Sequence, residues 1–229
     1  MKPVSATPRK IVATPRRRSK AAFLAAAFAL GLGGCSVLPQ RPPPHALSTY
    51  RIALPPSTGG KTAVENAVCS PLRVAAPSAA AGFGGPDMRY SETAGTIATF
   101  AYHRWAAPPA RMLGPLLVQT LSDSGLFETV LAADSPAAAP LQLDTQLVAL
   151  LQRVDGAQSH VHLIVRSSLS NLQTHHQLAA HRFVIDTPAK AATPEAGVQA
   201  TDAAIARWNQ ELVAWLSSVA RTGLCSPTR

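Results

Sequence analysis

Hydrophobic and polar residues alternate along much of the chain with the period of two that is typical of half-buried β-strands. The longest alternating runs cover residues 141–152, 161–169 and 173–185, and we expect a tight turn at Asn171-Leu172 between the last two. Gly95 separates two shorter runs, which predicts a hairpin. The shorter predicted strands cover residues 49–54, 71–76, 88–93, 96–102 and 126–131. Long alternating strands in succession indicate an antiparallel meander with one solvent-exposed face.

Two other segments repeat their apolar residues every three or four positions, which predicts helices. The first is Pro108–Ser124, followed by Gly125 where helix-ending glycines are common. Pro115 fits this helix poorly because it lacks a backbone N–H. The second helix begins after Thr193, a good N-cap. Its apolar stripe is Val198, Thr201, Ile205, Trp208, Leu212, Trp215 and Val219. The order of elements predicts an α+β two-layer sandwich, in which a mostly antiparallel or mixed sheet carries both helices on one face.

The first residues have the pattern of an export signal. Residues 2–20 are basic, residues 21–34 are apolar, and Cys35 follows directly. The sequence Leu32-Gly33-Gly34-Cys35 resembles a bacterial lipobox, which implies cleavage before Cys35 and acylation of its thiol and new amino group. The apolar run would rise only about 21 Å as a helix, which is short of a hydrocarbon core of about 30 Å. The alternative is an ordinary secretory signal with an incidental cysteine.

The sequence therefore divides into three parts. Residues 1–34 are a lipoprotein signal peptide, and residues 35–48 are a lipidated, proline-rich tether that lifts the domain off the membrane. Residues 49–225 form the domain itself. Ser36, and not Asp, follows Cys35, which by resemblance to known lipoprotein sorting favours the outer membrane over the inner one.

The charge distribution agrees with export. The full chain has a formal net charge of +9, which by itself would suggest a nucleic-acid or membrane-surface binder. Seven of the 21 basic residues lie in the first 20 positions, where no acidic residue occurs. The rest of the chain holds 21 − 7 = 14 basic and 12 acidic residues, so processing leaves a nearly neutral protein. We expect no nucleic-acid partner.

Two cysteines remain once Cys35 is lipidated. In an oxidising periplasm Cys69 and Cys225 are expected to pair, which would tie the start of the domain to the end of its last helix. For so long a closed loop, the chain-entropy treatment gives on the order of 4–5 kcal/mol of stabilisation. The alternatives are a redox pair, which the lack of a C-x-x-C sequence disfavours, and two free or intermolecular thiols.

The sequence contains no G-x-S-x-G, H-E-x-x-H, P-loop or dinucleotide-binding fingerprint, so we expect no catalytic residue and no cofactor. Histidines are the weak metal candidates. His160 and His162 share one face of a predicted strand, and a two-residue turn at Asn171-Leu172 would bring His181 opposite His162. The alternative is that these are exposed strand histidines without a metal.

The segment Tyr102–Pro109 (YHRWAAPP) has the composition of an interface hot spot, since a strand ends there in aromatic and basic residues before two prolines open a helix. The predicted partner-binding residues are Tyr102, Arg104, Trp105, Pro108 and Pro109. The alternative is structural: Trp105 caps the core and Arg104 pairs with a carboxylate.

These segments carry a family resemblance. The blocks are, in chain order, the lipobox, Tyr50-Arg51, Met88-Arg89-Tyr90, Tyr102–Pro109, Leu113 to Leu121, and Ser124-Gly125-Leu126-Phe127. Together they resemble the ABC-type transport auxiliary lipoproteins of the paraquat-inducible protein C type, over about residues 49–220. The resemblance implies a non-enzymatic lipoprotein in the inner leaflet of the outer membrane, facing the periplasm. It also implies a role in lipid transport, with an MCE-domain (mammalian cell entry) periplasmic protein and, through it, an ABC permease and ATPase.

Three functions remain open at this point. In the first, the protein is a docking subunit whose Tyr102–Pro109 surface contacts the MCE protein or a second copy of the chain. In the second, it is a lipid-binding carrier with its own pocket between the helices and the sheet. In the third, it is an exported metal-dependent hydrolase that uses His160, His162 and His181.

Overall fold

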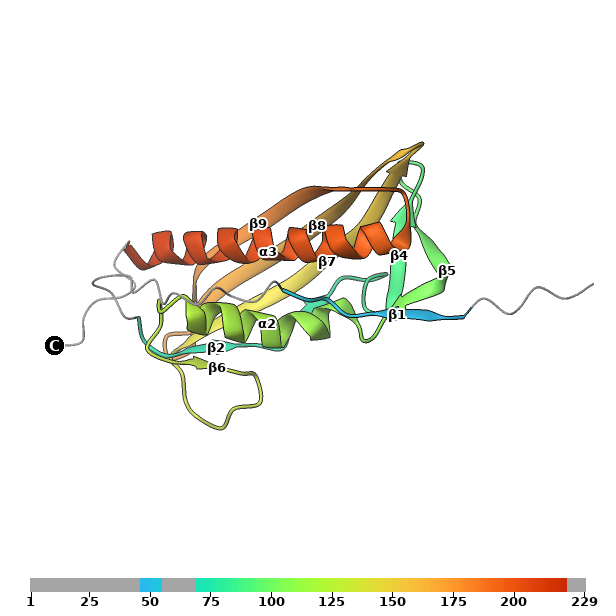
Figure 1. Cartoon of the computed structure of the whole chain (residues 1–229). Helices are drawn as coiled ribbons and strands as arrows, with labels where there is room; N and C mark the ends of the chain where they lie inside the picture. Colours follow the sequence, from blue (N-terminus) through green and yellow to red (C-terminus); the bar gives the residue numbers. More distant parts are fainter. Residues whose placement is uncertain (1–45, 55–68, 222–229) are drawn as a thin grey trace, which may run out of the picture. The chain divides into compact units, whose positions relative to one another are not determined.

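A mixed sheet of nine strands carries two helices in the part of the chain that the structure, a computed structural model, describes: residues 46–54 and 69–221 (Figure 1). The strands are β1 (Ser48–Tyr50), β2 (Leu72–Val74), β3 (Ser78–Ala79), β4 (Asp87–Ser91), β5 (Ala98–Trp105), β6 (Val130–Leu131), β7 (Leu141–Asp155), β8 (Gln158–Asn171) and β9 (His176–Ala189). The helices are α2 (Pro109–Asp123) and α3 (Pro194–Val219). This arrangement confirms the predicted α+β class.

Strand β7 is the centre of the sheet. On one side it pairs with β8 along its whole length, antiparallel, and β8 pairs in the same way with β9. On the other side three short strands, β2, β3 and β4, follow one another along β7, all parallel to it. Beyond them β6 pairs with β2, and β5 pairs with β4 in the predicted hairpin and with β1.

The alternation along β7 reverses once. The sequence pattern places Leu147, Ala149 and Leu151 on the same buried face, but a register shift between Leu147 and Ala149 inserts one extra residue. Such a bulge turns every later side chain to the opposite face. Leu150 and Gln152 are therefore buried, and Leu151 is only half-buried. The prediction for Leu151 was wrong for this reason.

The two long hairpins have different turns. Between β7 and β8, Asp155 pairs with Gln158, so the turn has two residues, and its Gly156 has a φ of +58°. Between β8 and β9 the predicted two-residue turn at Asn171-Leu172 is wrong, because Asn171 pairs with His176. The Asn171 side-chain oxygen accepts from two amides inside a longer turn, at 2.8 and 3.0 Å, and stabilises it.

Both predicted helices are confirmed. Helix α2 runs through Pro115, which is exposed, and Gly125 after it has a φ of +64°. Thr193 is the N-cap of helix α3, and its hydroxyl accepts from the Ala196 amide at 3.3 Å. The middle of the predicted stripe is buried, from Thr201 to Leu212, with Trp208 fully buried. Its ends are only half-buried: Val198, Trp215 and Val219. Neither described helix combines the length and hydropathy that a membrane-spanning helix needs.

Candidate docking surface

The end of β5 separates the predicted partner-binding residues into an outer and an inner set. Tyr102 is 48% exposed and Arg104 is exposed, whereas Trp105 is only 4% exposed. Because successive strand residues point to opposite faces, Arg104 and Trp105 cannot serve the same surface. Trp105 is a core residue, as the structural alternative expected, and does not contribute to a contact surface.

The two prolines of the segment shape the chain, and a role of Pro108 in partner binding stays a prediction. Pro108 is the N-cap residue of α2, and Pro109 is its first residue and is buried. A proline at the first helical position loses nothing, because the amide it lacks has no partner inside the helix. Pro108 and Pro109 therefore turn the chain from β5 into α2 and hold the end of β5 in place.

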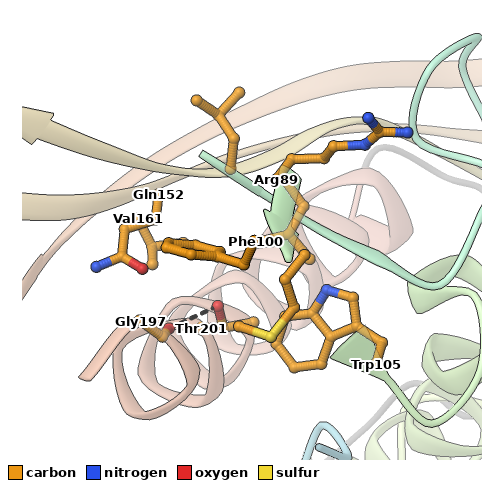
Figure 2. A pocket seen from close by; sticks show the side chains of 10 residues that line it. Arg89, Phe100, Trp105, Gln152, Val161, Gly197 and Thr201 are labelled. Carbon is orange, nitrogen blue, oxygen red and sulfur yellow. Dashed lines mark hydrogen bonds between the residues drawn. The ribbon is translucent and has the colours of Figure 1, made fainter. Parts of the chain in front are cut away.

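Trp105 packs against a small void between the sheet and α3 (Figure 2). The void has a volume of about 10 Å³, the size of one water molecule, so it is not a ligand site. Next to it the buried Gln152 amide donates to the Ser159 hydroxyl at 2.8 Å and to the Thr193 carbonyl at 3.1 Å. On the facing helix, the Thr201 hydroxyl donates to the Gly197 carbonyl at 2.9 Å.

A hydrogen-bonded trio joins β1, β5 and α3. The Tyr50 hydroxyl donates to a Glu195 carboxylate oxygen at 2.8 Å and lies 3.0 Å from His103 Nδ1. Since a phenol has one hydrogen, the His103 ring N–H donates to the Tyr50 oxygen. Burial raises the pKa of Tyr50, as does its hydrogen bond to Glu195. The sequence analysis missed this trio because its members are far apart along the chain.

Beside this trio lies a groove along β5, with a volume of about 330 Å³. It is lined by Leu47, Pro86, Asp87, Thr99, Phe100, Ala101, His103 and Arg104. Leu47 is 54% exposed at its rim. Asp87 faces Arg104 in the ladder but pairs with Arg89 at 3.0 Å. Within the described residues Arg104 has no carboxylate partner, so its charge is available at the surface.

A larger hollow, of about 530 Å³, lies between α2 and the segment that links β2 to β3. Its lining residues are Val74, Ala75, Ala76, Pro77, Arg111, Gly114, Pro115, Val118, Gln119, Ala132, Ala133 and Asp134. Most of these are apolar or small. The loop on its far side is held by Arg73, whose guanidinium donates to the carbonyls of Ala133 at 3.3 Å and Ser135 at 2.9 Å.

The three candidate metal-binding histidines do not come together. His162 pairs with Asp186 at 2.7 Å, and His160 lies 3.8 Å from the same carboxylate oxygen. His181 pairs with Ser167 in the ladder and lies against Phe183 and Trp215. The longer turn before β9 shifts the register and separates His181 from His162. Where the chain is described, no three His, Cys, Asp or Glu side chains are grouped to hold a metal ion.

Some predicted sites lie outside the described residues. These are the lipidated Cys35 and Cys225 of the predicted disulfide. Cys69 is buried, at 1% exposure, and its amide donates to the Leu126 carbonyl at 3.0 Å. The pairing of Cys69 with Cys225 stays a prediction.

The fold is thus an α+β domain that exposes Tyr102 and Arg104 beside a groove. The family model of the ABC-type transport auxiliary lipoprotein component matches residues 50–213. The chain belongs to this family, as its sequence blocks predicted, and the family is described as an auxiliary component of transport.

Solved structures share the fold. Protein XCC0632 from Xanthomonas campestris, of the family DUF330, is 20% identical, with a TM-score of 0.65 over 76% of this chain and 98% of that one. A second crystal structure, of an uncharacterized protein, is 16% identical, with a TM-score of 0.59 over 75% of this chain and 99% of the other. A comparison with curated protein sequences finds no significant match.

Proposed function

We propose that this protein is a non-enzymatic docking subunit of an MCE-type lipid transport system. Acyl chains on Cys35 anchor it in the inner leaflet of the outer membrane, and its domain faces the periplasm. There it binds an MCE-domain protein, and through it an ABC permease and ATPase. Family membership supports the auxiliary role, and the lipobox with Ser36 after Cys35 supports the location.

The observation that carries this proposal is the surface formed by Leu47, Tyr102 and Arg104 around the β5 groove, called here the docking surface. Tyrosine and arginine are the residues that most often dominate binding energy at interfaces. The strand that presents them is rigid, because Trp105 is buried in the core beneath it. A rigid strand keeps the entropy cost of binding low.

The docking surface is also tied to the lipid anchor by a short chain. Leu47 comes one residue after the first described residue, Ala46, which is eleven positions after Cys35. A fully extended chain of that length spans at most about 40 Å. The surface would therefore meet its partner close to the outer membrane, where the end of a conduit between the two membranes must arrive.

Substitution of the docking surface tests this function. We expect Tyr102→Ala and Arg104→Glu each to reduce co-purification with the MCE protein roughly ten- to thirtyfold, the usual effect of an interface hot spot. The matched controls, Leu172→Ala and Arg207→Glu, change exposed residues elsewhere and should leave co-purification unchanged. Wild-type co-purification by both surface variants, with normal folding, would refute the assignment.

The 530 Å³ hollow beside α2 favours a second candidate function, the lipid carrier. Its volume is in the range of small-molecule sites, and its walls are largely apolar. Native mass spectrometry of a Cys35→Ser protein, which has no acyl anchor, distinguishes the two functions. A carrier should retain a phospholipid that is lost in a Val118→Asp variant, whereas a docking subunit should carry none.

A further inference from the structure

Strand β9 is an edge of the sheet that leaves a long row of backbone groups without a strand partner. It has 14 residues, and within the described residues it pairs with β8 alone. An edge of this length can pair with a strand from another chain. Most natural edge strands are shorter than this or are protected against pairing with other chains.

The register shows which backbone groups face outward. The two-residue turn between β7 and β8 makes Asp155 and Gln158 a hydrogen-bonded pair. Along an antiparallel ladder the backbone N–H and C=O groups of successive residues point alternately to the two neighbouring strands. The backbone of Ser159 therefore bonds to Ala189 of β9, and the backbone of Pro188 faces away from β8. The even-numbered residues from 180 to 188 therefore present the free edge. Pro188 belongs to this set, where its missing N–H costs the sheet nothing.

The outward residues carry opposite charges on the two sides of Val184. Val184 itself is 47% exposed. Arg182 lies two residues before it and Asp186 two residues after it, and both are exposed. Within the described chain Arg182 has no ion pair, and Asp186 contacts His162 and His160 through Oδ1 alone. If a second β9 ran antiparallel with Val184 opposite Val184, Arg182 of each copy would face Asp186 of the other, which is a favourable cross-strand pair.

Helix α3 leaves room for this arrangement. It crosses the sheet diagonally: Gly197 near its start lies against Gln152 of β7, whereas Trp215 near its end lies 5.9 Å from the His181 ring on β9 (Figure 1). The helix thus covers the first half of β9 and not its end at Ala189. In an antiparallel pair the covered half of one copy lies beside the uncovered half of the other, so the two helices do not collide.

We propose that two copies of this protein join through β9, antiparallel about a two-fold axis at Val184, to form one continuous sheet. The occupant of the edge is a second copy because the charges on the edge are complementary to themselves, with Arg182 of each copy opposite Asp186 of the other. This interface is separate from the docking surface on β5, so the dimer would present two docking surfaces to partners.

A cysteine on the axis tests the geometry directly. In a hydrogen-bonded antiparallel pair the Cα atoms lie about 5.5 Å apart, within the range that a disulfide spans. We expect Val184→Cys in the full-length, membrane-anchored protein to cross-link into a dimer under mild oxidation. The control Leu172→Cys is also exposed but lies in the turn before β9 and should not cross-link. Equal cross-linking by the two variants, or none, would overturn the proposal.

Charge and backbone variants test the pairing itself, with the purified full chain in detergent and sedimentation as the measurement. We expect Arg182→Asp to raise the dimer dissociation constant roughly tenfold, and Arg182→Asp with Asp186→Arg to restore it. Val184→Pro removes one outward amide and should also dissociate the dimer, whereas Val184→Thr keeps the amide and should not. Circular dichroism confirms that each variant is folded. A monomeric wild type, or a Val184→Cys variant that cross-links to a different protein, contradicts the second-copy proposal.

Discussion

Gly197 on α3 lies directly against the Gln152 side chain on β7, so closely that a β-carbon at residue 197 would collide with Gln152 Oε1. The helix can approach the sheet at this point only because residue 197 has no side chain. The same approach buries the Gln152 amide, which bonds to Ser159 and to the Thr193 carbonyl. The contact between these two residues therefore sets the height of the start of α3 above the sheet.

Gly197→Ala should destabilise the domain although alanine is the better helix former. Helix propensity alone would stabilise the variant by about 1 kcal/mol. The collision with Gln152 should outweigh this: overpacking usually costs about 1–3 kcal/mol, so the free energy of unfolding should fall by up to about 2 kcal/mol. Urea denaturation measures the change. In a Gln152→Ala background the collision is gone, so the same substitution should become neutral or stabilising; equal loss in both backgrounds would exclude the collision as the cause.

Tyr50→Phe should weaken the attachment of β1 to β5 and α3 and so destabilise the domain. The substitution keeps the ring and removes the hydroxyl that joins His103 to Glu195. We expect the free energy of unfolding to fall by about 1 kcal/mol, the typical value of one hydrogen bond. Thermal or urea unfolding measures it. The matched control is Tyr90→Phe, whose ring stacks on Phe100 and whose hydroxyl makes no hydrogen bond in the described part. A larger loss in the control than in Tyr50→Phe would contradict the role of the trio.

Glu195 should make the stability depend on pH in the acid range. Its pKa is held below the ordinary value of 4.5, first by a backbone hydrogen bond at the start of α3 and then by the Tyr50 hydroxyl. A carboxyl with a lowered pKa stabilises the fold above its unfolded pKa and loses this effect as the pH falls through the folded value. Glu195→Gln should therefore be less stable than the wild type at pH 7, and the difference should shrink below about pH 4. Urea titrations at both pH values test this, with Glu92→Gln as the control for loss of one exposed carboxylate.

Cys225→Ser should lower stability if the predicted bridge to Cys69 exists. A native disulfide that closes a long loop contributes about 2–5 kcal/mol. We expect Cys225→Ser in oxidising buffer to unfold at the same urea concentration as the wild type treated with reductant. Reductant should have no further effect on the variant. A wild type that is insensitive to reductant would show that the cysteines are not paired.

The local patterns of the chain predicted the elements well. Strands and helices bury one side against the core. Their apolar residues therefore recur with periods of 2 and 3.6, which can be recognised in a short stretch of sequence. The helix that begins after Thr193 and the long strand pairs follow directly from this. The lipobox and the family blocks are also local, because each is a short run of consecutive residues. These features could be predicted from the sequence because each depends only on near neighbours.

Other features depend on where distant segments meet. The two-residue turn at Asn171-Leu172 was a reasonable prediction, but the longer turn shifted β9 and moved His181 away from His162. The bulge before Ala149 reversed the end of β7 and buried Gln152. No local pattern signals either event, because a register is chosen by the packing of the whole sheet against its helices.

The sequence by itself determined the class of this protein: an α+β domain of the ABC-type transport auxiliary lipoprotein family, with a Tyr-His-Arg-Trp segment before its first helix. Only the tertiary structure decided that Tyr102 and Arg104 face outward while Trp105 faces the core, and that Tyr50, His103 and Glu195 meet. The physical reason is that burial alternates from one strand residue to the next, and which of two neighbours is buried depends on the layer that packs above the strand.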